Sequence, residues 1–287
     1  MNPFFFQKFW DSIGDDVSTV VLSILDGHPI PSKLNHTYVA LIPKKPKPEN
    51  IFDFCPISLC HVIYKLIMKV IANRLKPLLP SIISNTQGAF TQGRLISNNV
   101  LIACKVLHAM RGDMTVDGSM AVKLDMSKAF DRVEWPFLKS VILRLGFRED
   151  WVNLVMRCVK SASFSFIING HPSEHIIHSR DILQGGPLSP FLFLFCSEGL
   201  TRLIADAVDS RSVRGYNINA RAPVVSHLLF TATLLYSVVP TYLKPPLLGT
   251  SCARTRMLRD KQSISQKLTY LLVKELLQNE ETKSRSF

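Results

Sequence analysis

The chain has 287 residues, of which 47% are hydrophobic and 20% charged, so it is long and apolar enough to fold around a sizeable core and is not a disordered tail. Its 34 Lys and Arg against 22 Asp and Glu give a formal net charge of +12, which favours an anionic partner, most commonly nucleic acid. Charge alone does not identify that partner, because many basic proteins bind nothing in particular.

The N-terminal half predicts helices separated by one strand and a basic loop. Apolar residues recur every three to four positions in three stretches, which is the spacing of an amphipathic helix. A β-rich run over residues 37–42 is closed by Pro43 and followed by residues 44–48, Lys-Lys-Pro-Lys-Pro, which form a loop because proline breaks a helix interior. The predicted helices are residues 4–25, 61–79 and 97–110.

The C-terminal half predicts a mixture of strands, helices and hairpins. Asn169-Gly170 predicts a tight turn between two β-rich arms, because this dipeptide favours positive φ. The expected strands are residues 121–125, 164–168 and 174–177, the expected helices are residues 136–145, 151–160 and 191–206, and residues 224–239 are expected to be a buried strand and hairpin. Beyond residue 241 the composition becomes rich in Lys, Arg, Ser and Gln, and residues 267–278 have the pattern of one further helix.

The order of these elements predicts an α+β fold and not a doubly wound parallel sheet, because helices and hairpins do not alternate regularly. No membrane association is expected. The apolar stretch 224–239 contains Ser226 and His227 and is shorter than the roughly 20 apolar residues of a spanning helix. Residues 1–10 are aromatic-rich but lack the features of a signal peptide.

The cysteines predict neither a zinc site nor a disulfide framework. They are scattered, without a Cys-x-x-Cys pair and without a histidine at ligand spacing. In a chain of this length such cysteines indicate buried, reduced thiols of an intracellular protein, with nucleus and cytoplasm equally open. The six are Cys55, Cys60, Cys104, Cys158, Cys196 and Cys252.

Asp125 is the first candidate for chemistry. It follows the apolar strand residues Val122-Lys123-Leu124, and a carboxylate there can hold Mg²⁺, which prefers hard oxygen ligands. Taken alone, an Asp after a strand is more often a turn or cap residue. Asp131 on the same segment is better explained as a structural partner of a backbone amide or of Arg132.

Two loops offer further groups, each with a structural alternative. Lys44 and Lys45, with Lys47, are placed to grip a triphosphate or a template backbone as point charges, or simply to lie in solvent. The loop at residues 184–190, Gln-Gly-Gly-Pro-Leu-Ser-Pro, lets backbone approach a flat ligand because glycine has no Cβ, or it caps the next helix.

The order of these segments is more specific than any one of them. They follow one another as in reverse transcriptases, and more narrowly the chain resembles the polymerase of plant LINE-type (non-LTR) retrotransposons. The resemblance covers residues 4–236, and none is visible beyond them. It rests on Leu-Ile-Pro-Lys-Lys at 41–45, Phe-Cys-Pro-Ile-Ser-Leu at 54–59, Gln-Gly-Ala-Phe at 87–90 with Gly93-Arg94, Lys-Leu-Asp-Met-Ser-Lys-Ala-Phe-Asp at 123–131, and residues 184–190.

The resemblance implies the fingers and palm of a right-hand polymerase, with an antiparallel palm sheet packed on helices. It also implies two-metal nucleotidyl transfer with Mg²⁺, an RNA template, a DNA primer and deoxynucleoside triphosphates. Asp125 matches the first metal-binding aspartate, and Met126 would lend its backbone carbonyl to the same ion. Phe130 matches the aromatic gate that excludes a 2′-hydroxyl.

The same resemblance implies groups that bind nucleotide and template. Lys44 or Lys45 matches the fingers lysine near the triphosphate. Gln184 and Gly185 match the loop that supports template and nucleotide, and Arg94 is placed with these binding residues.

Three departures predict that this copy is inactive. The family motif Phe-Ala-Asp-Asp stands here as Phe230-Thr231-Ala232-Thr233, so the partner carboxylates are lost at Ala232 and Thr233 in a segment that is one residue short. Losing that charge removes several kcal/mol of barrier reduction, and each ~1.36 kcal/mol is tenfold in rate. Cys55 replaces an arginine that clamps the triphosphate, and Gly186 replaces an aspartate.

We therefore predict a helical lead-in at residues 1–33, reverse-transcriptase-like fingers and palm at residues 34–240, and a divergent basic tail at residues 241–287 without a recognisable thumb. The expected function is that of an RNA-directed DNA polymerase domain of a non-LTR retroelement, catalytically inactive in this copy. The alternatives are a non-catalytic protein that binds RNA or an RNA–DNA hybrid, and a pseudogene product without function.

Overall fold

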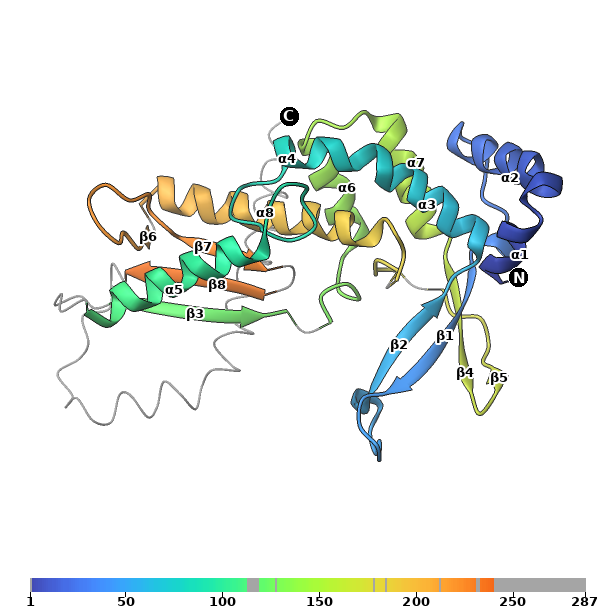
Figure 1. The fold of residues 1–287 in the computed structure, drawn as a ribbon, viewed down its shortest axis with the longest axis horizontal. Coiled ribbons are helices and arrows are strands. Elements are labelled where there is room, and N and C mark those ends of the chain that lie inside the picture. The colour runs from blue at the N-terminus through green and yellow to red at the C-terminus, as the bar shows by residue number, and fades with distance from the viewer. Residues whose placement is uncertain are drawn as a thin grey trace, which may run out of the picture.

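Two β-sheets lie at opposite ends of a set of helices in the computed structural model of the chain (Figure 1). The structure describes residues 2–112, 119–126, 128–177, 179–183, 185–211, 213–230 and 233–239. The helix predicted over residues 267–278 lies outside these ranges. The mixed arrangement of helices and sheets confirms the predicted α+β class.

The first sheet has the strand order β2-β1-β4-β5. Its strands are β1 His36–Pro43, β2 Phe54–Leu59, β4 Ser163–Ile168 and β5 His171–Pro172. β1 pairs antiparallel with β2 and parallel with β4. β2 was not among the predicted strands, because Pro56 interrupts its β pattern; proline is tolerated there since β2 is an edge strand.

The hairpin predicted around Asn169-Gly170 is present, and both residues have positive φ, 52° and 81°. Its second strand is β5 at residues 171–172 and not residues 174–177 as predicted. Farther along that arm, Ile176 still exchanges two backbone hydrogen bonds with Phe164, of 3.0 and 2.8 Å.

The second sheet is antiparallel throughout, as predicted for the palm. Its strands are β3 Met120–Asp125, β6 Arg214–Gly215, β7 His227–Phe230 and β8 Thr233–Val239. β8 pairs with β3 on one side and with β7 and β6 on the other. The strand and hairpin predicted over residues 224–239 are therefore confirmed.

The helices match the predicted periodicity, with two interruptions. They are α1 Pro3–Lys8, α2 Trp10–Leu25, α3 Val62–Leu75, α4 Leu79–Ile82, α5 Ile96–Gly112, α6 Trp135–Arg144, α7 Glu149–Lys160 and α8 Ser189–Asp209. The first predicted helix breaks at Phe9. The second gives way to a 3₁₀ turn, Lys76–Leu78, because Pro77 has no N–H for the α-helical ladder. None of the described helices is long and apolar enough to cross a membrane.

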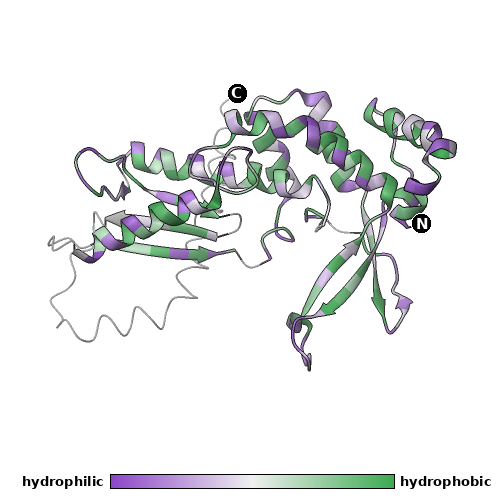
Figure 2. Ribbon diagram, viewed as in Figure 1, coloured by the Kyte–Doolittle hydropathy of each residue, from purple (hydrophilic) through white to green (hydrophobic). Residues whose placement is uncertain are grey.

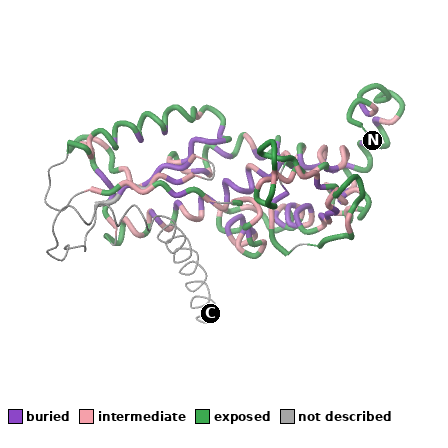
Figure 3. Tube along the Cα trace, turned by 90° about the horizontal axis from the view of Figure 1, so that it is seen from below, coloured by how far each residue is buried: buried purple, intermediate pink, exposed green. Residues whose placement is uncertain are grey.

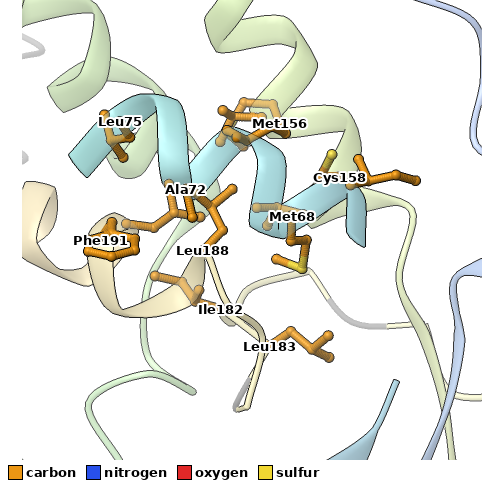
Figure 4. Close-up of a cluster of buried hydrophobic side chains, with 14 of the residues drawn as sticks. Met68, Ala72, Leu75, Met156, Cys158, Ile182, Leu183, Leu188 and Phe191 are labelled. Carbon is orange, nitrogen blue, oxygen red and sulfur yellow. The ribbon is translucent and has the colours of Figure 1, made fainter. Parts of the chain in front are cut away.

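The main core lies where α3, α6, α7 and α8 meet. Met68 and Leu75 of α3, Met156 of α7, and Leu188 and Phe191 at the start of α8 all point into this cluster (Figure 4). Hydrophobic residues are frequent along these helices (Figure 2), and the buried ones form this cluster. Buried residues run through the middle of the molecule, whereas α5 and the N-terminal helices turn exposed residues outward (Figure 3).

Candidate active site

Asp125 and Thr233 lie directly opposite each other at one end of the second sheet. Asp125 is the last residue of β3 and pairs in register with Thr233, the first residue of β8. The Thr233 hydroxyl donates a hydrogen bond to Asp125 Oδ1 at 3.2 Å. Phe230, the last residue of β7, also pairs with Thr233, so the end of β7 and the start of β8 meet beside the end of β3. Thr231 and Ala232 lie outside the described residues.

The donor set at this position does not fit two magnesium ions. Among the described residues, no group of three or more His, Cys, Asp or Glu side chains is placed to hold a metal. The partner that the sheet gives Asp125 is a neutral hydroxyl, which donates a hydrogen bond to the carboxylate and, unlike a second carboxylate, adds no negative charge. Asp125 is exposed, and it remains the predicted ligand of a single loosely held ion.

Phe130, on the segment that follows β3, is anchored against α8. Its ring stacks on Phe193 of α8, with centroids 4.9 Å apart and planes 19° apart. Its backbone carbonyl accepts hydrogen bonds from the amides of Ile182, at 3.1 Å, and of Val133, at 3.4 Å. Met126, between Asp125 and Phe130, is half-buried against the main core. Phe130 is therefore anchored both by a ring of α8 and by two backbone amides.

Asp181 is a residue that the sequence analysis missed, and no pattern in the sequence marks it. Its φ is +118°, a region that side-chain-bearing residues rarely adopt. Its Oδ1 is buried without a hydrogen-bond partner among the described groups. Burial, and then the charge of nearby Asp131, raise the pKa of Asp181 to about 7. Its backbone carbonyl accepts a hydrogen bond from Trp135 Nε1 at 2.9 Å, which fixes this conformation.

Lys44 and Lys45 lie in the loop that joins β1 to β2 and folds back on itself. Lys44 Nζ donates to the backbone carbonyl of Phe52 at 3.2 Å, and Lys45 Nζ forms an ion pair with Asp53 at 2.9 Å. Lys45, followed by the backbone amides of Asn50 and Glu49, lowers the pKa of the Asp53 carboxyl. Both lysines are thus pre-ordered at the tip of the first sheet, where they remain predicted triphosphate or template contacts.

Arg94 is tied into the loop that precedes α5. Its guanidinium donates four hydrogen bonds to backbone carbonyls, at 2.6–3.2 Å. The acceptors are Pro80, Ile83, Ser84 and Gln87. These bonds engage both terminal nitrogens, so they support a role for Arg94 in ordering residues 80–94. The template contact predicted for Arg94 from the sequence remains a prediction.

Replacing Arg94 by methionine should lower the free energy of unfolding by about 2–4 kcal/mol, because charge-assisted hydrogen bonds to half-buried carbonyls are lost. Chemical denaturation of both proteins measures this difference. The exposed Arg148→Met is the matched control and should change stability by less than about 0.5 kcal/mol. Unchanged stability with weakened template affinity would instead assign Arg94 to direct nucleic-acid contact.

The glycine loop before α8 packs against the end of β2. Gly185 has φ +92°, and a Cβ placed on it would lie 3.9 Å from the Ser58 carbonyl oxygen. A Cβ on Gly186 would lie 2.8 Å from Ser189 Oγ and 3.2 Å from Met68, so an aspartate there would force its neighbours to move. Gln184 lies outside the described residues.

Cys55 belongs to β2, opposite Ile42 of β1. It is half-buried on the same strand as Ser58, which borders the glycine loop. Cys55, which is predicted to replace the arginine that clamps the triphosphate, therefore lies on the strand of the first sheet that faces the glycine loop. Its thiol offers no set of donors that matches a phosphate.

A polar network that the sequence analysis did not identify positions β7. Asn99 of α5 is buried, and its Nδ2 donates to the carbonyls of Thr86 and Leu229 at 2.9 and 3.1 Å. The Leu229 amide donates to Thr86 at 2.8 Å, and the Gly88 amide donates to Leu229 at 3.3 Å. The position of β7 thus depends on the loop at residues 86–88 and on α5.

Comparison with known proteins finds one matching family and several similar proteins. Residues 42–220 match the family described as "Reverse transcriptase (RNA-dependent DNA polymerase)". The uncharacterized 149 kDa protein of transposon TX1 from Xenopus laevis is 31% identical over 218 residues, which are 73% of this chain and 16% of that protein.

A retrovirus-related Pol polyprotein from the type-1 retrotransposable element R2 of Popillia japonica is 27% identical over 251 residues, 86% of this chain and 34% of the polyprotein. A solved structure of telomerase from Candida tropicalis with a fragment of telomeric RNA aligns with a TM-score of 0.49 and 10% identity, over 81% of this chain and 40% of that one. The chain spans less than half the length of each of these three proteins.

Proposed function

Because the chain belongs to the reverse transcriptase (RNA-dependent DNA polymerase) family, we propose that it is the fingers and palm of a plant LINE-type polymerase whose catalytic centre has lost its metal-binding charge. Its relatives are proteins of non-LTR retroelements. The proposed limits are residues 1–33 for the lead-in, 34–240 for fingers and palm, and 241–287 for the tail. The plant assignment is supported by the order of the five sequence motifs and by the residues that make them up.

One observation carries the proposed inactivity. The β3–β8 pairing sets Thr233 against Asp125, at the position where the family motif would supply a carboxylate. The hydroxyl–carboxylate hydrogen bond between them adds no negative charge. A single exposed aspartate does not offset two divalent ions, so the transfer of a nucleotide to a primer 3′-hydroxyl should be slowed by several powers of ten.

The function that this geometry still supports is binding of an RNA template paired with a DNA primer. The chain keeps a net charge of +12 and the ordered lysines at the tip of the first sheet. Such binding would make it a non-catalytic protein that holds an RNA–DNA hybrid. A chain without this affinity would be a relic without function.

The purified protein should bind a short RNA–DNA hybrid with an affinity that falls steeply as salt rises, because counterions are released from the phosphates. Fluorescence anisotropy at several salt concentrations measures the slope of log affinity against log salt. Changing Lys44 and Lys45 together to methionine should reduce that slope by about 1–2, or about one per lost phosphate contact.

Lys33→Met is the matched control, since Lys33 is an exposed lysine outside the β1–β2 loop. It should leave the slope nearly unchanged. Salt-independent or undetectable binding by the folded native chain would rule out the hybrid-binding function. The alternative of a product without function would then remain.

A further inference from the structure

Three lysines from two parts of the chain contact Phe52 or its neighbour Asp53, in the loop between β1 and β2. Lys44 reaches its backbone carbonyl at 3.2 Å, and Lys45 pairs with the neighbouring Asp53 at 2.9 Å. The third is Lys128, whose Nζ lies 5.3 Å from the centroid of the Phe52 ring. Lys128 follows β3 of the second sheet, only three residues after Asp125. This contact therefore joins the two sheets beside the candidate site.

Lys128 is exposed and directly precedes two anchored residues. Its φ of +52° is uncommon for a residue with a side chain. The two residues that follow are anchored: Ala129 packs against the main core and Phe130 stacks on Phe193. The anchored residues limit the motion of Lys128 on one side, which reduces the entropy cost of binding a ligand.

The partner that holds Lys128 is weak. Phe52 is 70% exposed, and a cation–π contact at such a site contributes little. No described carboxylate pairs with Lys128 within ion-pair distance, although Asp125 lies nearby in the sequence. Of the three ammonium groups, that of Lys45 has a described ion-pair partner, Asp53, so a polyanion that met all three would compete effectively with the ring.

We propose that Lys128 is a third cation of the triphosphate site. Without nucleotide its ammonium rests on Phe52, and on binding it exchanges the aromatic face for phosphate oxygens of a deoxynucleoside triphosphate held jointly with Lys44 and Lys45. This assignment rests on the proposed function. Lys128, which follows β3 of the second sheet, would supply the positive charge that Cys55 of β2 cannot provide.

Equilibrium binding of deoxythymidine triphosphate, measured by calorimetry without nucleic acid, tests the exchange. Lys128→Met should weaken affinity about tenfold, and Lys128→Arg should keep it within about threefold of the native value. Phe52→Leu should strengthen affinity about threefold, because the competing cation–π contact is removed. The affinities of the variants for inorganic tripolyphosphate should follow the same order, since the lysines contact only the phosphates.

One matched variant and one measurement separate this effect from general loss of charge or fold. Lys33→Met should bind triphosphate like the native chain, and thermal unfolding should confirm that every variant is folded. Unchanged affinity in Lys128→Met, or a loss in Phe52→Leu equal to that in Lys128→Met, overturns the proposal. A native chain that binds no triphosphate overturns it as well, whereas hybrid binding is measured separately and tests the proposed function on its own.

Discussion

Changing Ala232 and Thr233 together to aspartate should raise RNA-templated primer extension by roughly 10³-fold or more over the native chain. The reason is the register of the second sheet, which sets residue 233 against Asp125. A carboxylate there would replace the hydroxyl that now donates to Asp125, and a second at 232 would complete a charge set suited to divalent ions. Extension of a labelled primer with Mg²⁺ or Mn²⁺ measures the gain.

The isosteric pair Ala232→Asn with Thr233→Asn is the matched control, because it restores size without charge. It should remain at the native level, and Asp125→Ala in the restored chain should return extension to background. Adding Cys55→Arg should increase the restored activity further, at low nucleotide concentration above all. Robust extension by the native chain, abolished by Asp125→Ala, would contradict the assignment of an inactive centre.

Asp181→Asn should stabilise the protein at neutral and alkaline pH and have little effect in acid. The pKa of Asp181 is raised in the folded protein from 3.8 to about 7, so the folded state favours the protonated carboxyl. The resulting stabilisation is full below the unfolded-state pKa and is lost as the pH rises through about 7. Asparagine carries no charge at any pH, so its advantage should grow to about 2–4 kcal/mol near pH 8.

Denaturant unfolding of both proteins between acid and alkaline pH measures this difference. The difference between the two proteins isolates Asp181 from other groups, such as His227, whose pKa burial lowers to about 4 and which acts in the opposite direction. Asp131→Asn is the control for the neighbouring charge and should give a smaller gain with the same sign. A pH-independent difference between native and Asp181→Asn would show that backbone strain, and not ionisation, dominates at this position.

Local patterns were sufficient to predict most elements of the fold. The periodicity of α3, α5 and α6 and the Asn169-Gly170 turn depend on neighbours within a few residues, and these are visible in the chain itself. β2 was missed because its strand is stabilised by pairing with β1 in spite of Pro56. The break at Phe9 also had no local signal.

The candidate site was predictable only where a motif carried it. Asp125, Phe130 and the lysines of the β1–β2 loop came from the order of motifs, and the structure shows their surroundings. Lys128 lies within one of the five motifs, but its contact with Phe52 joins residues 76 positions apart and depends on how these two segments pack. Asp181 has no motif at all, because its raised pKa arises from burial by residues distant in sequence.

The sequence by itself determined the family, the order of helices and strands, and the absence of carboxylates at Ala232 and Thr233, because each of these is a property of residue identity and short-range spacing. Only the tertiary structure decided that Thr233 lies against Asp125, that Arg94 is engaged by four carbonyls, and that Lys128 meets the β1–β2 loop. Strand register, burial and charge proximity are set by packing between distant segments, and no local pattern encodes them.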